Sequence, residues 1–176
     1  MRVFTLQTEL WLPRPRTEVF PFFADARNLE RLTPRWLNFE VLTPAPIVMR
    51  AGTLIDYRIR IHRFPIRWRT EITEWEPLHH FTDVQLRGPY TLWQHTHAFE
   101  EWDGGTLCLD HVRYRPRGGA LVYWLFVRHD VERIFQYRQQ RLRELFEQSR
   151  SAISAGGLGR RDGLHDGVSP RSQLDA

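Results

Sequence analysis

The sequence contains no lysine, and all 25 of its basic residues are arginines. A lysine nucleophile or a Schiff-base mechanism is therefore excluded within these 176 residues. Every cationic side chain is instead a planar guanidinium, which keeps its charge and can hold a carboxylate or phosphate through two hydrogen bonds. The simplest explanation of the arginine bias is the codon usage of a GC-rich genome.

Cysteine and long apolar runs are also scarce. The single Cys108 has no partner for an internal disulfide, which suits a reducing compartment. The longest apolar run, residues 120–127, is far shorter than the ~20 residues that a membrane-spanning helix needs. Residues 1–12 alternate in hydrophobicity and do not form the apolar core of a signal peptide. We therefore expect a soluble, cytoplasmic protein.

The composition fits one globular domain followed by a tail. A chain with 41% hydrophobic and 26% charged residues is too apolar for a disordered protein and too charged for a membrane-embedded one. Residues 151–176 hold five of the eleven glycines and no aromatic residue, so we predict a domain over 1–150 and a disordered tail over 151–176. The tail's charges cancel, which assigns the net charge of +4 to the domain.

The hydrophobic periodicity predicts an α+β domain. A strand over 3–12 is followed by two short helices, the first starting at Pro15 and the second spanning 25–32. Period-two patterns then predict six strands, over 37–42, 53–61, 66–75, 81–86, 90–100 and 106–114. From about 120 to 149 the apolar residues follow a helical period. A curved seven-stranded antiparallel sheet around one long helix encloses more volume than the helix fills, so we expect an internal cavity.

Four stretches of the chain carry a family resemblance. They are LPRPRTEVFPFFADARNLERLTP (12–34), IDYRIRIHRFPIRWRTEITEWEP (55–77), GPYTLWQHTHAFEEWDGGTLCLDHVRY (88–114) and LFVRHDVERIFQYR (125–138). Over about residues 3–146 the chain resembles the START-related SRPBCC superfamily, which includes polyketide cyclases and dehydratases, coenzyme-Q-binding proteins and birch pollen allergens. It is most similar to the small bacterial ligand-binding branch, a domain that also occurs fused to epimerase-like domains in proteins labelled cell-division inhibitors. The resemblance implies the helix-grip fold, and it carries no universal catalytic motif.

Strand parity predicts which side chains face the cavity. If 62–65 form the turn of the hairpin 53–75, Ile61 faces Ile66 and Ile59 faces Trp68, and these apolar pairs share the inner face. The same register places Tyr57 opposite Thr70 and Ile55 opposite Ile72. On the strand 90–100, the inner set is Trp93, His95, His97 and Phe99. The residues predicted to bind a ligand are Tyr57, Ile59, Trp68, Thr70, Trp93, His95, His97, Phe99, Ile134 and Arg138.

His95 and His97 lie two residues apart, so both imidazoles can reach one ion or one substrate. A metal site needs a third ligand, and only Asp110 or His111 on the following strand is near, so we expect neither a metal nor a cofactor. An acid–base role for His97, with Asp110 as the orienting carboxylate, is better supported because imidazole titrates near neutral pH. The alternative is that both imidazoles are hydrogen-bonded parts of the cavity wall.

Arg138 interrupts the apolar stripe of the predicted C-terminal helix, between Ile134 and Leu142. A buried guanidinium is costly without a negative partner. We favour an ion pair with an inward-facing carboxylate such as Asp110. The alternative is that Arg138 holds a carboxylate or phenolate of a ligand with two hydrogen bonds.

Two surface features suggest possible partners. The predicted register places Arg60 opposite Arg67 and Arg58 opposite Arg69 on the outer face. This cluster is either a solvated surface or a contact for an acidic protein, a membrane surface or phosphates. The segment 123–126 is apolar on more than one helix face, as in a cavity lid or a site that docks on a membrane or partner. No nucleic-acid-binding module is present, so specific nucleic-acid recognition is not expected.

Three functions remain open at this point. The first is a non-enzymatic binder or carrier of an apolar small molecule, such as a lipid, a polyketide or an isoprenoid-like compound. The second is an enzyme of the cyclase or dehydratase type that uses His95 or His97 as the acid–base group. The third is an interaction module that acts through the outer arginines. We favour the binder.

Overall fold

The computed structural model describes residues 2–61 and 63–156. In this part of the chain, seven strands form one antiparallel sheet in the order β1-β7-β6-β5-β4-β3-β2. The sequential neighbours from β2 to β7 pair directly, and β1 joins the sheet beside β7. The strands are β1 (Phe4–Leu12), β2 (Glu40–Val41), β3 (Leu54–Ile61), β4 (Phe64–Glu76), β5 (His80–Arg87), β6 (Tyr90–Trp102) and β7 (Gly105–Pro116). The helix-grip fold expected from the sequence is confirmed.

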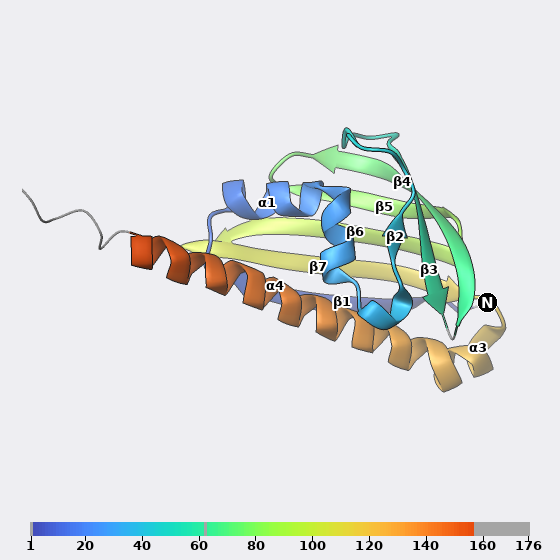
Figure 1. Ribbon diagram of the computed structural model, residues 1–176. Helices are drawn as coiled ribbons and strands as arrows, with labels where there is room; N and C mark the ends of the chain where they lie inside the picture. Colours follow the sequence, from blue (N-terminus) through green and yellow to red (C-terminus); the bar gives the residue numbers. More distant parts are fainter. Residues whose placement is uncertain (1, 62, 157–176) are drawn as a thin grey trace, which may run out of the picture.

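The helical elements lie on the open side of the curved sheet, with α4 crossing it and α1 on the same side (Figure 1). The helix α4 runs to Gly156, six residues past the predicted end of the domain at residue 150. The remainder of the predicted tail lies outside the described residues. The helices are α1 (Arg16–Ala24), η1 (Ala26–Asn28), α2 (Leu29–Leu32), η2 (Arg35–Leu37), α3 (Gly119–Val122), the π-helical turn η3 (Tyr123–Val127) and α4 (Arg128–Gly156).

The strand predicted over 37–42 is reduced to the two residues of β2. Arg35–Leu37 form a 3₁₀ turn, and Asn38 follows it with a left-handed φ of 42°. Asparagine tolerates this conformation better than most residues, so the chain turns here before it can pair with β3. Leu37 of η2 lines the cavity described below.

The β3–β4 hairpin has a shorter turn than the sequence predicted. Ile61 pairs with Phe64, so two residues connect the strands, and Arg63 has a φ of 73°. Two-residue turns with positive φ match the right-handed twist of the paired strands, which favours this turn over the predicted four-residue one.

The shorter turn moves β4 by two residues relative to the predicted pairing. Ile59 pairs with Ile66, Tyr57 with Trp68 and Ile55 with Thr70, so the predicted partners are wrong. A shift of two residues leaves every side chain on its original face, because side chains alternate with period two. The predicted inner face is therefore correct.

Two apolar clusters secure the helices to the sheet. The larger cluster packs α1 and the C-terminal part of α4 against the sheet, and includes Phe20, Phe99 and Leu142. The smaller cluster packs the start of α4 on β7, through Tyr114 and Phe135 among others. The cavity described below touches residues of both clusters, so it lies between them.

Candidate functional site

A cavity of about 180 Å³ lies between the sheet, the α1–η2 segment and α4. Strand alternation supplies one wall, because residues two apart on a strand, such as His95 and His97 on β6, point to the same side and line the cavity. Helix α4 supplies the opposite wall through residues spaced three or four apart. Nine of the ten residues predicted to bind a ligand line the cavity: Tyr57, Ile59, Trp68, Thr70, Trp93, His95, His97, Ile134 and Arg138.

Phe99 is the exception. It is 2% exposed and belongs to the larger apolar cluster rather than to the cavity wall. Its ring packs edge-on against Phe20 and Phe23, with ring centroids 5.4 and 5.0 Å away. The predicted inward orientation is correct, but α1 covers this end of β6 and separates Phe99 from the cavity.

Aromatic rings with satisfied polar ends form much of the sheet wall. The indole Nε1–H of Trp68 donates to Thr70 Oγ1 at 3.1 Å, and the Tyr57 hydroxyl lies 2.9 Å from the same oxygen. The Trp68 ring stacks on Tyr57 and meets Trp93 edge-on. Burial and the nearby Asp83 charge raise the pKa of Tyr57 well above its usual value. The ring contacts and the hydrogen bonds to Thr70 hold the rings in place, while burial keeps Tyr57 neutral.

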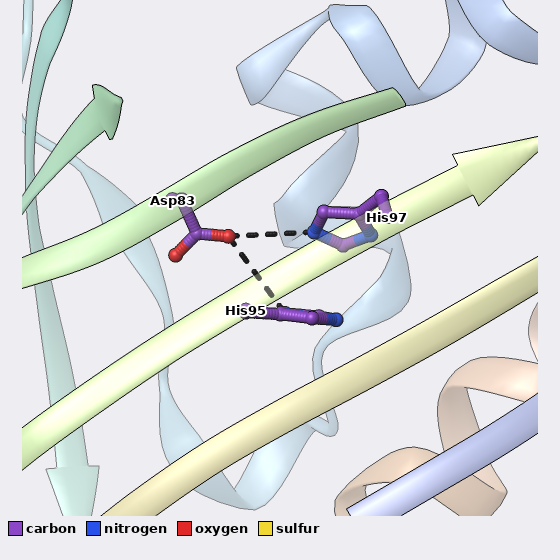
Figure 2. Close-up of side chains that lie close together, drawn as sticks. All are labelled: Asp83, His95 and His97. Atoms are coloured by element: carbon purple, nitrogen blue, oxygen red, sulfur yellow. Dashed lines mark ion pairs between the residues drawn. The ribbon is translucent and has the colours of Figure 1, made fainter. Parts of the chain in front are cut away.

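A layer of two imidazoles between two carboxylates forms the polar part of the site. Asp83 on β5 pairs with His95 on β6, and His97 on β6 pairs with Asp110 on β7, so all four side chains share the inner face. Asp110 Oδ1 lies 2.8 Å from His95 Nε2 and 2.9 Å from His97 Nδ1. Figure 2 shows the opposite side, where Asp83 Oδ2 lies 3.7 Å from His95 Nδ1 and 3.4 Å from His97 Nε2.

The electrostatics of this layer favour neutral His95 and ionised Asp110. Burial lowers the pKa of His95 to about 4, with the neighbouring His97 acting in the same direction. Burial alone would raise the pKa of Asp110. The charge of Arg138 and the hydrogen bonds from both imidazoles outweigh it, so the pKa of Asp110 lies well below its ordinary value. The Thr8 hydroxyl also donates to Asp110 Oδ2 at 3.3 Å.

Arg138 faces the same layer from α4. Its Nη2 lies 3.4 Å from His97 Nδ1, and its guanidinium sits over the Phe23 ring, 5.4 Å from the centroid. The predicted ion pair with Asp110 is wrong: within residues 2–61 and 63–156, the ion pairs of Asp110 are with His95 and His97, and Arg138 makes none. The His97 ring lies between the guanidinium and Asp110, so Arg138 acts on Asp110 only through its charge.

Asp83 was missed as a site residue from the sequence. The strand 81–86 was predicted, and the parity that places Phe81 inward also places Asp83 inward, so the signal was present. His111, considered as a third metal ligand, pairs with Thr96 and faces away from the imidazoles. His97 and Asp110, predicted to act together, lie next to each other, with His97 Nδ1 2.9 Å from Asp110 Oδ1.

The outer arginine cluster is more neutralised than its sequence suggested. Arg58 faces Arg67, whereas Arg60 faces Pro65, so both predicted arginine pairs are wrong. Arg58 forms an ion pair with Glu40. Arg69 donates two hydrogen bonds of 2.8 Å to Asp56, whose pKa is lowered mainly by this contact. Exposed pairs of this kind contribute little to stability, about 0–1 kcal/mol.

A second hollow of about 490 Å³ adjoins the cavity at the start of α4. It shares Leu37, Ile61, Tyr90 and Ile134 with the cavity, and residues of α3 and η3 border it. Leu121, Trp124 and Leu125 are exposed beside it. The apolar segment noted in the sequence therefore lies at the rim of this hollow. No helix in the described residues has the length and apolar character needed to span a membrane.

Comparison with known proteins agrees with this architecture. The family described as polyketide cyclase / dehydrase and lipid transport matches residues 12–143. The chain belongs to this family. The resemblance to the SRPBCC superfamily is thereby confirmed, and the membership supports a ligand-binding or cyclase-type function. None of the curated proteins compared with the chain matches it.

Solved structures show the same fold at low sequence identity. The Zhui aromatase/cyclase from Streptomyces sp. R1128 is similar with a TM-score of 0.67 and 14% identity, over 89% of this chain and 100% of that one. Protein Ms6760 from Mycobacterium smegmatis is similar with a TM-score of 0.62 and 19% identity, over 85% and 98%. The major latex-like protein 151 from Panax ginseng has a TM-score of 0.59 and 8% identity, over 82% and 97%. These similarities show the fold alone, so the site of this chain has to be argued from its own residues.

Proposed function

We propose that the protein binds a small, largely apolar molecule in the cavity between the sheet and α4. The volume of about 180 Å³ supports this, because an engineered apolar cavity of roughly 150 Å³ takes up benzene. A molecule of one or two rings fits the space, whereas a long-chain lipid needs more. Burial against the aromatic and aliphatic wall contributes roughly 25 cal/mol per Å².

The buried Arg138 supports a ligand with an acidic end. This side chain lines the cavity and is only 9% exposed, and its Nε has no hydrogen-bond partner among the described residues. An unsatisfied buried donor costs about 1–3 kcal/mol. A carboxylate or phenolate of the ligand would remove this cost and match the guanidinium's charge. This unpartnered donor in an apolar cavity is the observation that carries the proposal.

Calorimetric titration with naphthalene-2-carboxylate and its neutral amide tests the proposal. We expect the wild-type protein to bind the carboxylate more tightly than the amide. Arg138→Leu should weaken carboxylate binding by about 10- to 100-fold, since hydrogen bonds to charged groups contribute about 1.5–3 kcal/mol, and should leave amide binding unchanged. Arg113→Leu, on the exposed outer face of β7, is the matched control. Equal effects of the two substitutions would contradict the role of Arg138.

A second variant tests the cavity itself. Ile134→Trp places a large ring in the cavity and should abolish binding of both naphthalene compounds. Leu125→Trp adds the same ring at an exposed position and should change neither affinity. Circular dichroism of both variants verifies folding. Binding that persists in a folded Ile134→Trp protein would place the ligand elsewhere.

The geometry of His97 favours one alternative, a dehydratase-type enzyme. His97 lies 2.9 Å from Asp110, which can hold its Nδ1–H and leave the Nε2 lone pair as a base. The base would take a proton from the carbon next to a carbonyl and return it to the departing hydroxyl, releasing water. A β-hydroxy ketone is the probe, because its dehydration yields an enone with strong ultraviolet absorption. We expect turnover that His97→Ala abolishes; a substrate that remains unchanged with the wild-type protein would exclude this alternative.

A further inference from the structure

Three potential ligand atoms converge on one point of the cavity wall. Asp83, His95 and His97 each offer one such atom, and these atoms lie within 4.8 Å of one another. Asp83 Oδ2 lies 3.7 Å from His95 Nδ1 and 3.4 Å from His97 Nε2. Figure 2 shows the Asp83 carboxylate facing both rings, from the strand next to the one that carries them. All three residues line the cavity, and both imidazoles are buried. The sequence offered only Asp110 or His111 as a third ligand, and the structure adds Asp83 as a third potential ligand.

The hydrogen bonds to Asp110 determine which nitrogens carry protons. Asp110 Oδ1 lies 2.8 Å from His95 Nε2 and 2.9 Å from His97 Nδ1, and an ionised carboxylate can only accept hydrogen bonds. His95 Nε2 therefore donates to Asp110. His97 Nδ1 has two polar neighbours, Asp110 Oδ1 at 2.9 Å, which can only accept, and Arg138 Nη2 at 3.4 Å, which can only donate. The shorter contact is the one with the carboxylate, so we place the N–H of His97 on Nδ1. A neutral imidazole has one N–H, so the other nitrogen of each ring presents a lone pair. Both lone pairs face the negatively charged oxygen of Asp83, which makes three electron-pair donors with no donor hydrogen between them.

We propose that Asp83, His95 and His97 bind a divalent first-row transition metal ion of the zinc type. Two imidazoles and one carboxylate are a ligand set that proteins use for Zn²⁺ and for non-haem Fe²⁺. Metal-binding histidines usually donate their second N–H to a carboxylate, which fixes the tautomer and increases the basicity of the ring. Asp110 does this for both histidines at once. It is the positioning residue of the site and does not itself reach the ion.

The charges around the site accommodate a divalent cation. Asp83 and Asp110 contribute two negative charges, and Arg138 on α4 contributes one positive charge at the far side of His97. Three protein ligands leave at least one coordination position free, and the three residues direct it into the cavity. A bound ion would thus contact an oxygen of a molecule held there. The site goes beyond the proposed binding function and does not require it.

Metal binding and the dehydratase alternative exclude each other, because both use the lone pair of His97 Nε2. The remaining competing explanation for the cluster is a proton shared between Asp83 and an imidazole. That explanation predicts no stoichiometric metal uptake, so one titration separates the two.

The test uses untagged protein that has been treated with a chelator and dialysed. Titration with Zn²⁺ by calorimetry, and with Co²⁺ by visible absorption, should give one equivalent bound to the full chain. Asp83→Asn and His97→Gln should abolish binding. Asp110→Asn should weaken it by about 10- to 100-fold, the usual effect of losing an orienting carboxylate. His129→Gln, exposed on α4, and His111→Gln, which faces away from the cluster, are the controls and should bind as the wild type does.

Two results would overturn the site. One is a wild-type protein that takes up neither ion, and the other is uptake that Asp83→Asn and His97→Gln leave unchanged. Circular dichroism of the near-isosteric Asp83→Asn variant verifies that a loss of binding is not a loss of fold. Titration of the metal-free protein with naphthalene-2-carboxylate keeps the two proposals separate. Binding of the carboxylate without metal leaves the proposed function intact whatever the metal result.

Discussion

Replacing Phe99 with alanine should lower stability strongly while leaving ligand binding intact. The position is 2% exposed, and its ring contacts Phe20, Phe23 and Phe81 at centroid distances of 5.4, 5.0 and 6.2 Å. Truncation removes these contacts and leaves a space that α1 cannot fill without moving. The ring does not line the cavity, so the wall that meets the ligand stays the same.

The magnitude of the stability loss follows from this packing. Phe→Ala substitutions in protein cores cost about 3–5 kcal/mol, and the near-complete burial of Phe99 places it near 4 kcal/mol. For a domain of this size, each kcal/mol lowers Tm by about 2–4 °C, so we expect a decrease of about 10 °C. Domains of ordinary stability have about 5–15 kcal/mol in total, so the variant should remain folded at 25 °C.

Urea denaturation measures the stability of Phe99→Ala, and calorimetric titration with naphthalene-2-carboxylate measures its ligand affinity on the same samples. Trp93→Ala provides the comparison, because Trp93 lies on the same face of β6 and lines the cavity. It should reduce affinity, whereas Phe99→Ala should not. A Phe99→Ala protein with unchanged stability and an affinity reduced as much as that of Trp93→Ala would refute the placement of Phe99 beneath α1.

Two further predictions concern α4 and β7. Leu142 is 1% exposed, so Leu142→Ala should cost about 3 kcal/mol of unfolding free energy. Leu121 is 70% exposed, so Leu121→Ala should leave the urea midpoint nearly unchanged. Equal midpoints of the two variants would show that α4 does not pack as described. Burial raises the pKa of Cys108 from 9.0 to about 12, so the thiol stabilises the fold at neutral pH and this stabilisation is lost as pH rises through that interval. The wild type should lose about 1.4 kcal/mol per pH unit more than Cys108→Ala does above pH 9, and parallel stability curves of the two proteins would contradict this.

The alternation of side chains could be predicted from the sequence, because strand parity is a local property. It correctly placed Trp68, His95 and His97 on the inner face. The pairing partners depended on the length of the turn after Ile61, which the sequence predicted as the four residues 62–65 and which is two residues long in the structure. The predicted inner face was still correct, because turns of two and four residues differ by an even number of residues.

Strand parity could not predict which inward-facing residues are covered by a helix and which line the cavity. Phe99 and Trp93 have the same parity, and only the position of α1 places one in the core and the other at the cavity. The contact between Arg138 and His97, instead of Asp110, depends on how α4 is seated on the sheet. Both properties involve residues far apart in the chain. Asp83 was within reach of the sequence pattern, but a carboxylate among apolar neighbours is read more easily as a surface residue.

One wall of the cavity comes from a single rigid element. Helix α4 contributes Val131, Ile134, Phe135 and Arg138 to it, spaced by three or four residues along the same face. A sliding or tilting of this helix therefore moves the wall and the guanidinium together, so the room for a ligand's rings and the position of its charged end cannot vary independently. Sequence changes on the buried face of α4, such as at Leu142, would alter ligand choice from a distance, without touching any residue that meets the ligand.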